Sequence, residues 1–383
     1  MKTIIVLGST GSIGKNTLEV AGRNKDRIRI RGLAARGNVE LLEKQIAKFS
    51  PEAVAVWDSS KAGKLKKKLA GRVKVYSGME GLLDLVRLDA DMVVSALVGI
   101  VGLEPSLEAI RSGKDIALAN KEILVAAGRI IMAEAEQRGV KIIPVDSEHS
   151  ALMQCLWERN HGEIRKIILT ASGGAFYQRP GADLSRITPE EALEHPTWSM
   201  GPKVTVDSAT LINKGFEVIE ASCLFRIPVD KIEITIHPQS IVHAMVEFID
   251  GSVTALMHAP DMRLPIQYAI SWPERWGGDY AKLELSDLGT LNFTKPDMER
   301  FPALELAYRA GRMRGTVPAV FSAADEVCVN RFLNRKIKFT DIVPGIKKIM
   351  EMHRPVSNPA LEDIMAADEW ARRETAELLD NKK

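Results

Sequence analysis

Short runs of aliphatic and β-branched residues alternate with amphipathic stretches over residues 1–146. Runs of this length between turn-forming residues predict buried strands, and the stretches between them have the spacing of helices that cover a sheet. Helices of this kind are expected at Asn38–Phe49 and Gly128–Arg138, among others. The strands expected are Thr3–Leu7, Ile28–Ala34, Ala53–Val56, Met92–Ser95, Asp115–Ala117 and Lys141–Val145. The pattern therefore predicts an α/β fold with an N-terminal parallel sheet wrapped by helices.

The pattern changes between residues 147 and 271, where polar loops interrupt the apolar runs. The composition of the runs predicts four strands, at Lys166–Thr170, Lys231–Ile236, Ala244–Ile249 and Ser252–Ala259. The last two are joined through Asp250 and Gly251, a pair that readily forms a tight hairpin turn. We expect a central α+β domain with an antiparallel sheet.

Proline and glycine are frequent between residues 272 and 297, and helical stretches follow. The frequent prolines and glycines predict a connecting segment. Helices are expected over residues 302–314, 318–334, 341–352 and 359–380. The predicted division is therefore an N-terminal domain over 1–146, a central domain over 147–271, the connecting segment over 272–297 and a C-terminal helical bundle over 298–383.

Charge and composition narrow the class of protein. The 383 residues carry 52 basic and 50 acidic side chains, a formal net charge of +2, and the basic residues are dispersed, which argues against a nucleic-acid-binding protein. The densest basic run, Lys61–Lys68, is typical of the solvated face of a helix.

The three cysteines and the apolar runs indicate the compartment. Cys155, Cys223 and Cys328 are widely spaced among apolar neighbours, which predicts buried thiols and no disulfide framework. No apolar run approaches the about 18 residues needed to span a membrane, and the first strand begins without a leader sequence. We expect a cytoplasmic protein without a membrane partner.

The first expected strand leads into a glycine-rich turn from which a helix starts. Glycine allows the backbone to approach a pyrophosphate, whose charge then meets the free N–H groups at the helix N-terminus. Such turns also occur without a ligand, but the flanking strand and helix favour a Rossmann-like, dinucleotide-binding domain. The cofactor-binding residues expected here are Gly8, Thr10, Gly11, Ser12, Ile13 and Gly14.

The segment after the second strand indicates which dinucleotide binds. In NAD-binding units an acidic residue accepts a hydrogen bond from the ribose 2′-hydroxyl at this place. Here the segment reads Arg36-Gly37-Asn38, without an acid. Arg36 would face a 2′-phosphate favourably and Asn38 could donate to it, although a plain surface arginine is the alternative. We expect NADPH as the cofactor.

Two carboxylates follow the last strand of the N-terminal sheet, in Asp146-Ser147-Glu148. Residues i and i+2 of an extended segment project to the same side, so Asp146 and Glu148 could converge on one cation with the Ser147 hydroxyl beside it. A solvated rim is the alternative. The position at the carboxyl end of a sheet strand, where doubly wound folds bind ligands, favours a metal site.

A further polar cluster runs from Ser208 to Glu217. Ser208, Asn213 and Lys214 supply a hydroxyl, an amide and a compact cation, which are the groups that hold a phosphate. Glu217 falls on the same helical face as Lys214 and could supply a third carboxylate to the metal, whereas Glu220 is expected to be structural. Oxygen ligands of this kind favour Mg²⁺ or Mn²⁺ over zinc.

Taken together, the motifs of this chain resemble those of the 1-deoxy-D-xylulose 5-phosphate reductoisomerase family, and the resemblance spans the whole sequence. The matching motifs are Leu7-Gly-Ser-Thr-Gly-Ser-Ile-Gly14, Ala119-Asn-Lys-Glu122, Pro144-Val-Asp-Ser-Glu-His149, Ala171-Ser-Gly-Gly174, His195-Pro-Thr-Trp-Ser-Met-Gly201, Val206-Asp-Ser-Ala-Thr210, Asn213-Lys-Gly215 and His237-Pro-Gln-Ser240.

The resemblance implies an isomerisation of the deoxyxylulose phosphate to a branched aldose, and then hydride transfer from NADPH to give 2-C-methyl-D-erythritol 4-phosphate, for non-mevalonate isoprenoid synthesis. It implies a homodimer, and metal ligation by Asp146, Glu148 and Glu217. By matching position, the residues that hold the substrate phosphate would be Ser172, Ser208, Asn213 and Lys214, with His195 lining the same site.

The resemblance also assigns the reacting end of the site. It implies substrate contacts from Lys121 and Ser147, and cofactor contacts from Asn120, Glu122 and Gly201. The stretch His195–Gly201 is similar to a mobile lid in which Trp198 and Met200 cover the substrate. The catalytic residues implied are Lys121, Glu148, His195 and Trp198. Without the resemblance, a surface histidine and a packed aromatic would be the ordinary interpretations of His195 and Trp198.

Two other classes of protein share parts of this pattern. A metal-dependent NADP hydroxy-acid dehydrogenase would have the same cofactor domain without a change of carbon skeleton, and Ser208–Lys214 argues against it. A non-catalytic NADPH-binding regulator would not need three convergent carboxylates. Activity on non-phosphorylated hydroxy acids would indicate the first, and function without metal the second.

Overall fold

A computed structural model describes residues 1–179 and 181–380, so the last three residues of the predicted C-terminal domain lie outside the described residues. The chain forms two compact units, and neither is one continuous stretch. Unit 1 comprises residues 1–123, 131–150 and 261–280, and unit 2 comprises 124–130, 151–260 and 281–383. The division into domains at residues 146, 271 and 297 stays a prediction.

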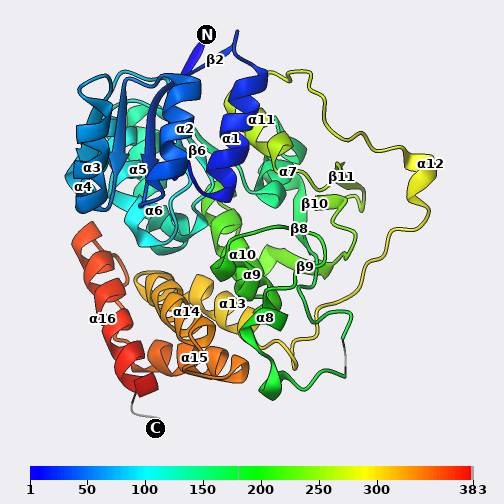
Figure 1. The fold of residues 1–383 in the computed structure, drawn as a ribbon. Coiled ribbons are helices and arrows are strands. Elements are labelled where there is room, and N and C mark those ends of the chain that lie inside the picture. Colours follow the sequence, from blue (N-terminus) through cyan, green and yellow to red (C-terminus); the bar gives the residue numbers. More distant parts are fainter. Residues whose placement is uncertain (180, 381–383) are drawn as a thin grey trace. The chain divides into compact units, whose positions relative to one another are not determined.

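Unit 1 is built on a seven-stranded parallel sheet of order β4-β3-β2-β1-β5-β6-β7 (Figure 1). The inner strands are apolar throughout because helices cover both faces of such a sheet; Ile4–Leu7, for example, is fully buried. The strands are β1 (Lys2–Leu7), β2 (Ile28–Ala35), β3 (Ala53–Val56), β4 (Lys74–Ser77), β5 (Met92–Ser95), β6 (Asp115–Leu118) and β7 (Ile142–Pro144). The predicted parallel sheet is confirmed.

One strand of this sheet was not predicted. β4 lies at the edge of the sheet, and its residues Lys74 and Ser77 are exposed. An edge strand needs no continuous apolar run, so the hydrophobic pattern did not reveal it.

The helices of unit 1 follow the strands in βα order. They are α1 (Ser12–Arg23), α2 (Val39–Phe49), α3 (Ser59–Leu69), α4 (Gly78–Val86), α5 (Leu103–Arg111), α6 (Lys121–Arg138), α7 (Ser147–Cys155) and α11 (Arg263–Ser271). The middle of α6 belongs to unit 2, as does the C-terminal half of α7. α6 is broken at Ala127 (φ −131°), and only its second half, Gly128–Arg138, was predicted. α11 packs against α1 although more than two hundred residues separate them.

Unit 2 contains a four-stranded sheet of order β11-β10-β8-β9. The strands are β8 (Ile164–Ala171), β9 (Ile232–Ile236), β10 (Val242–Phe248) and β11 (Val253–Met257). The predicted hairpin between β10 and β11 is confirmed, with Gly251 in the left-handed region (φ 85°). The expectation of an antiparallel sheet is wrong in one respect, because β8 and β9 pair in parallel. Between them the chain passes through helices, and a crossover of this kind returns the next strand in the same direction.

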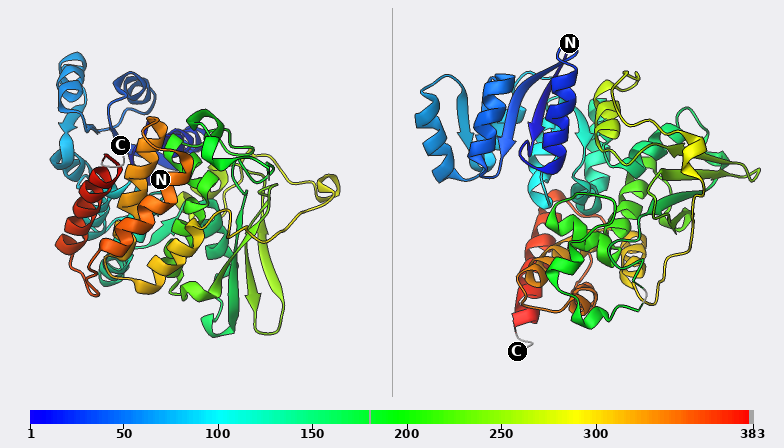
Figure 2. Two further views of the ribbon diagram at one scale, coloured as in Figure 1. Left: turned by 90° about the horizontal axis from the view of Figure 1, so that it is seen from below. Right: turned by 45° about the vertical axis from the view of Figure 1, so that its right-hand side comes forward.

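The remaining helices of unit 2 are α8 (Pro189–Ala192), α9 (Pro202–Thr210), α10 (Ile212–Phe225), α12 (Leu285–Leu288), α13 (Ala303–Met313), α14 (Val317–Leu333), α15 (Ile342–Met352) and α16 (Leu361–Asp380). The last four match the four predicted C-terminal helices closely. α14 packs against both α15 and α16, which lie beside it in the orange to red part of the chain (Figure 2).

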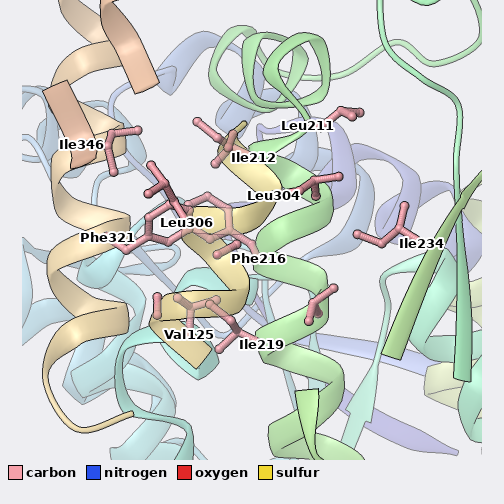
Figure 3. Close-up of a cluster of buried hydrophobic side chains, with 14 of the residues drawn as sticks. Val125, Leu211, Ile212, Phe216, Ile219, Ile234, Leu304, Leu306, Phe321 and Ile346 are labelled. Carbon is pink, nitrogen blue, oxygen red and sulfur yellow. The ribbon is translucent and has the colours of Figure 1, made fainter. Parts of the chain in front are cut away.

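The hydrophobic core of unit 2 surrounds α10 (Figure 3). Phe216 of α10 meets Phe321 of α14 edge to face, with ring centroids 5.2 Å apart. The backbones of α10 and α13 approach closely at Gly215, where an added Cβ would lie 2.4 Å from the Cβ of Ala307. α10 is therefore held on several sides, which makes it a rigid support for polar side chains.

Candidate functional site

The glycine-rich turn between β1 and α1 depends on glycine at two positions. Gly8 has φ +84°, and an added Cβ would lie 2.3 Å from the carbonyl oxygen of Ala96. At Gly14 an added Cβ would lie 2.2 Å from the Gly8 oxygen. Gly11 precedes α1 without a capping side chain, and Ser12 and Ile13 form its first turn after Thr10. Because no side chain caps this turn, its N–H groups could bind an anion, and the cofactor contacts of these residues stay a prediction.

A buried pair of hydrogen bonds holds this turn in place. The Ser9 hydroxyl donates to Gln45 Oε1 of α2 (2.8 Å), and Gln45 Nε2 donates to the Ser9 carbonyl oxygen (2.8 Å). Gln45 could not be identified from the sequence, because its partner lies 36 residues away in the chain.

The segment predicted to select NADPH follows β2. Arg36 is exposed, and Asn38 caps α2 by accepting a hydrogen bond from Leu41 N (3.1 Å) through Oδ1. The cap uses the amide oxygen of Asn38, so its nitrogen is the atom that could donate to a phosphate. Gly37 lies between the two residues and is half-buried.

The segment Asn120–Glu122 connects β6 to α6, at the carboxyl end of the sheet of unit 1. All three side chains are buried. Asn120 Nδ2 donates to the Gly99 carbonyl oxygen (2.9 Å), and Lys121 Nζ forms an ion pair with Asp146 Oδ2. The structure therefore brings together Lys121 and Asp146, which the sequence analysis had assigned to substrate and to metal.

The geometry predicted for Asp146, Ser147 and Glu148 is wrong, although the residues lie at the expected end of β7. α7 begins at Ser147, so Glu148 is in the first turn of a helix and not in an extended segment. The Ser147 hydroxyl donates to Glu148 Oε2. Two carboxylates separated by one residue do not share a side at a helix start in the way they would on a strand.

His149, fully buried on α7, was quoted in a motif but given no role by the sequence analysis. A ring nitrogen of His149 and a carboxylate oxygen of Asp146 lie within 4.8 Å of each other, close enough to share a metal ion. The spacing Asp-x-x-His could have identified His149, because residues i and i+3 lie on the same side of a helical turn. Imidazole together with carboxylate suits a transition metal such as Mn²⁺.

Ser172 and His195 form a pair in unit 2. Ser172 follows β8, and its hydroxyl lies 2.9 Å from His195 Nε2. His195 Nδ1 accepts from the backbone N–H groups of Thr197 (3.1 Å) and Trp198 (2.9 Å), so the ring hydrogen is on Nε2 and points to Ser172. Burial lowers the pKa of His195 to about 4, and the ring is neutral at pH 7.

The segment His195–Gly201, predicted to be a lid, has irregular backbone between α8 and α9. The Trp198 ring is half-buried and meets the His243 ring edge to face, with centroids 6.4 Å apart. Gly201 is the N-cap residue of α9, and Pro202 follows at its first position. The segment thus starts from a histidine that is anchored to Ser172 and ends at a helix N-terminus.

Three predicted phosphate and metal residues lie together on α10. Asn213 Nδ2 donates to Glu217 Oε1 (2.7 Å), and Lys214 Nζ donates to Glu217 Oε2 (2.5 Å). Glu217 is 1% exposed and Lys214 4% exposed, so this is a buried ion pair. The shared helical face predicted for Lys214 and Glu217 is confirmed. Ser208 is buried on α9, and Glu220 is fully buried on α10.

A buried charge cluster in unit 2 was not predicted. Lys203 Nζ of α9 lies 2.6 Å from Asp207 Oδ2 and 2.5 Å from Asp325 Oδ2 of α14. Both carboxylates are almost fully buried, and burial raises the pKa of Asp325 above its ordinary value, opposed by the charge of Lys203. The sequence signal was an aspartate within the apolar run of α14, at Ala323-Ala324-Asp325.

Three family models match most of the chain. They are described as 1-deoxy-D-xylulose 5-phosphate reductoisomerase over residues 4–128, its C-terminal domain over residues 142–225, and DXP reductoisomerase C-terminal domain over residues 257–374. In the described part of the chain, no helix has the length and apolar character that crossing a membrane requires.

Relatives match over the full length. The 1-deoxy-D-xylulose 5-phosphate reductoisomerase of Caldanaerobacter subterraneus subsp. tengcongensis is 52% identical over 369 residues, 96% of this chain and 97% of the relative. An enzyme of the same name from Bacillus cereus is 48% identical over 384 residues, 100% of both chains.

Solved structures also match over nearly the full length, at lower sequence identity. The reductoisomerase of Zymomonas mobilis in complex with NADPH has a TM-score of 0.92 and 42% identity, covering 99% of each chain. A DOX-P reductoisomerase in complex with NADPH, fosmidomycin and magnesium has a TM-score of 0.94 and 35% identity, covering 99% of this chain and 98% of that one.

Proposed function

We propose the function of this chain from its family: the chain belongs to the 1-deoxy-D-xylulose 5-phosphate reductoisomerases. The chain catalyses the NADPH- and divalent-metal-dependent conversion of 1-deoxy-D-xylulose 5-phosphate to 2-C-methyl-D-erythritol 4-phosphate. An isomerisation to a branched aldose precedes the hydride transfer. The reaction supplies non-mevalonate isoprenoid synthesis.

The observation that carries this proposal is the cluster of Asn213, Lys214 and Glu217 on α10. An amide and an ammonium group, both donors, lie beside a buried carboxylate within one helical turn. Donors of this kind hold a phosphate, and an adjacent carboxylate can ligate a cation. A hydroxy-acid dehydrogenase, the second candidate, has no use for a phosphate site.

In the present structure, Glu217 accepts the hydrogen bonds that the phosphate would take. A phosphate that binds to Asn213 and Lys214 has to compete with Glu217 for these donors. If Glu217 instead ligates a cation, its negative charge is neutralised by the cation and the donors turn to the phosphate. Metal and phosphate binding are therefore expected to favour each other.

The donor set fits a divalent cation. Asp146, Glu148 and Glu217 would hold it, all through the carboxylate oxygens that Mg²⁺ and Mn²⁺ prefer, and a relative binds magnesium. In this structure Asp146 pairs with Lys121 and Glu217 pairs with Lys214, and both lysines are buried. A bound cation would balance these two negative charges in place of the lysines. Held by these residues, a divalent cation would supply Lewis-acid chemistry, polarising the substrate carbonyl and stabilising the alkoxide.

The remaining polar groups orient the substrate. Ser172 and Ser208 would add hydroxyls to the phosphate site. The neutral His195 ring points its Nε2–H group at the Ser172 hydroxyl and so would line the same site. Lys121 and Ser147 contact the carbon chain. Trp198 and Met200 cover the substrate and exclude water from the hydride.

NADPH binds along the carboxyl end of the sheet of unit 1. The turn from Gly8 to Gly14 would hold its pyrophosphate, whose negative charge the N–H groups of α1 would meet. Arg36 and Asn38 would bind the 2′-phosphate, and Asn120, Glu122 and Gly201 would flank the nicotinamide end. The Zymomonas mobilis relative binds the same cofactor.

The assembly and the compartment complete the proposal. We infer a homodimer, as the resemblance to the family implies, and a cytoplasmic location, which the three widely spaced cysteines favour. Sedimentation of the purified chain tests the dimer, and a mass of 42.2 kDa would contradict it.

The experiment that tests the function is NADPH oxidation with 1-deoxy-D-xylulose 5-phosphate, with and without Mn²⁺ or Mg²⁺. We expect turnover only when the metal is present, with NADPH strongly preferred over NADH. Turnover of non-phosphorylated hydroxy acids with no turnover of the sugar phosphate would support the dehydrogenase instead. NADPH binding without any turnover would support a regulator.

A further inference from the structure

We propose that Lys61 recognises the 2′-phosphate of NADPH together with Arg36. The role of Lys61 rests on the proposed function, because it requires that NADPH be the cofactor. Lys61 is on α3, at the start of the basic run whose sequence indicates only a solvated helix face.

The structure holds Lys61 against the loop that carries Arg36. Three successive carbonyl oxygens, from the end of β2 into this loop, accept hydrogen bonds from the residues that lead from β3 into the first turn of α3. Trp57 N donates to Ala35 O (3.0 Å), Asp58 N to Arg36 O (3.0 Å), and Lys61 Nζ to Gly37 O (2.9 Å). The first two bonds fix the backbone of both loops, and the third places the Lys61 ammonium group beside Gly37.

Gly37 permits this approach. A Cβ added at Gly37 would lie 3.3 Å from Lys61 Nζ, which is tighter than ordinary van der Waals contact. A glycine between Arg36 and Asn38 therefore leaves room for a second cation beside the loop.

The ammonium group of Lys61 has donors to spare. It carries three N–H bonds, and the bond to Gly37 O uses one of them. The side chain is exposed, so the remaining donors face solvent, where a bound phosphate would replace water. Lys61 also lies in the first turn of α3, whose free N–H groups add a partial positive charge at this end of the helix.

The balance of charge favours a second cation here. A phosphate monoester carries about −1.5 to −2 charges at pH 7, more than Arg36 alone neutralises. Asp58, the N-cap of α3, accepts from Lys61 N through Oδ1 (3.0 Å), and Glu40 lies in the first turn of α2. Both carboxylates repel a phosphate, and Lys61 opposes their effect.

The rest of the basic run behaves differently. Lys68 forms an ion pair with Glu43 (2.5 Å), and Lys66, Lys67 and Lys68 lie in the last turn of α3. Lys67 is exposed, so it provides a matched control: its replacement makes the same change in net charge on the same helix.

The test compares two ligands that differ only in the 2′-phosphate, 2′-phospho-ADP-ribose and ADP-ribose, by calorimetry on the full chain. We expect Lys61→Met to weaken the binding of 2′-phospho-ADP-ribose about tenfold, the scale of one charge-assisted hydrogen bond. Binding of ADP-ribose should change by less than about twofold, because this ligand makes no contact with Lys61. Lys61→Arg should retain most of the preference, Lys67→Met all of it, and Arg36→Ala, the positive control, should lose it.

Two results would overturn the role of Lys61. Equal weakening of both ligands would show that Lys61 only supports the loop, and unchanged binding of both would show that it makes no contact with the phosphate. The proposed function fails separately: if wild type binds both ligands equally, NADPH is not the preferred cofactor and the role of Lys61 falls with it.

Discussion

His195 shows how the surroundings of one residue determine its protonation. The ring accepts two backbone hydrogen bonds at Nδ1 and is partly shielded from water, and both effects favour the neutral form. A charged ring would need to donate from Nδ1, toward the N–H groups of Thr197 and Trp198. Protonation of His195 therefore disrupts the start of the segment His195–Gly201.

We expect an acid-sensitive stability that depends on this residue. The unfolded chain binds a proton at His195 below about pH 6.5, whereas burial lowers the folded pKa to about 4. Between these values the unfolded state binds more protons, so the free energy of unfolding falls as the pH falls from 6.5 to 4. Urea unfolding at pH 7 and pH 5 measures this loss.

The control variants separate this effect from general acid sensitivity. His195→Gln should lose less stability between pH 7 and pH 5 than wild type, and His161→Gln, which removes an exposed histidine, should behave like wild type. An identical pH dependence in wild type and His195→Gln would contradict the assignment.

Glu217 is the residue on which the metal proposal depends. Glu217→Gln keeps the shape of the side chain and one oxygen. It removes the negative charge with which Asn213 and Lys214 interact and which a bound cation would need. We expect weaker Mn²⁺ binding, activity lower by at least about a hundredfold, and nearly unchanged NADPH binding. Separate titrations of Mn²⁺ and NADPH measure this.

Glu220→Gln is the matched variant, one turn along the same buried helix. It should bind Mn²⁺ like wild type. Wild-type metal binding and turnover in Glu217→Gln would show that Glu217 is not a ligand, and would direct attention to Glu220.

At the residue scale, local spacing was predictable and long-range pairing was not. Lys214 and Glu217 are three residues apart on one helix, and this spacing alone predicts their contact. Ser172 meets His195 through an irregular loop, and Lys203 meets Asp325 across 122 residues. Neither of these two contacts can be predicted from a helical or strand periodicity in the sequence.

At the scale of elements, the transition from β7 to α7 differs from the prediction. Asp146 to Glu148, which follow the predicted strand Lys141–Val145, were expected to be extended, whereas α7 starts at Ser147. Boundaries of this kind depend on capping and on the packing of the following helix, which the hydrophobic pattern does not encode. The Rossmann-like βα order was predictable because the strands other than the exposed edge strand β4 are largely buried and most of the helices between them are amphipathic.

The segment His195–Gly201 yields a prediction at the same scale. The Trp198 ring in this segment meets the His243 ring edge to face, a pair worth about 0.5–1.5 kcal/mol. Trp198→Ala should therefore lower turnover while the melting temperature and NADPH affinity stay nearly unchanged. Protease cleavage near residues 195–201 should slow in wild type when a phosphonate analogue is bound.

Trp157→Ala is the control, because Trp157 is 39% exposed and has no assigned role in the site. It should leave turnover unchanged. A large drop in melting temperature for Trp198→Ala would show that Trp198 is a core residue and not part of a lid.

At the scale of the whole molecule, the buried cluster of Lys203, Asp207 and Asp325 connects α9, which carries Ser208, to the C-terminal helices of unit 2. Asp325→Leu leaves Lys203 with one carboxylate in place of two. We expect it to lower the free energy of unfolding by about 1.5 to 3 kcal/mol, the scale of one hydrogen bond to a charged group, because Asp207 still pairs with Lys203. Urea denaturation measures this loss.

The exposed ion pair between Arg312 and Asp230 (2.8 Å) is the comparison. Asp230→Ala should cost less than about 1 kcal/mol, since solvent screens the pair. Equal losses in the two variants would mean that the buried cluster contributes no more than a surface pair.

The architecture of unit 1 was predictable at this scale, and that of unit 2 only in part. Parallel sheets follow from alternating strands and helices. The parallel pairing of β8 with β9 depends on the helical path between them, and the place of α11 in unit 1 depends on contacts far apart in the chain.

The discontinuity of unit 1 has a consequence for the order in which the nascent chain folds on the ribosome. The sheet is complete once residue 144 has emerged, but α11 arrives only with residues 263–271, after residues 151–260 of unit 2 have been made. Until then the face of α1 that α11 covers stays open to solvent, and Arg263 has not yet reached Glu19 (2.5 Å). Domains usually fold from the N-terminus during synthesis. In this chain the first unit to begin folding cannot finish until most of the second has been translated.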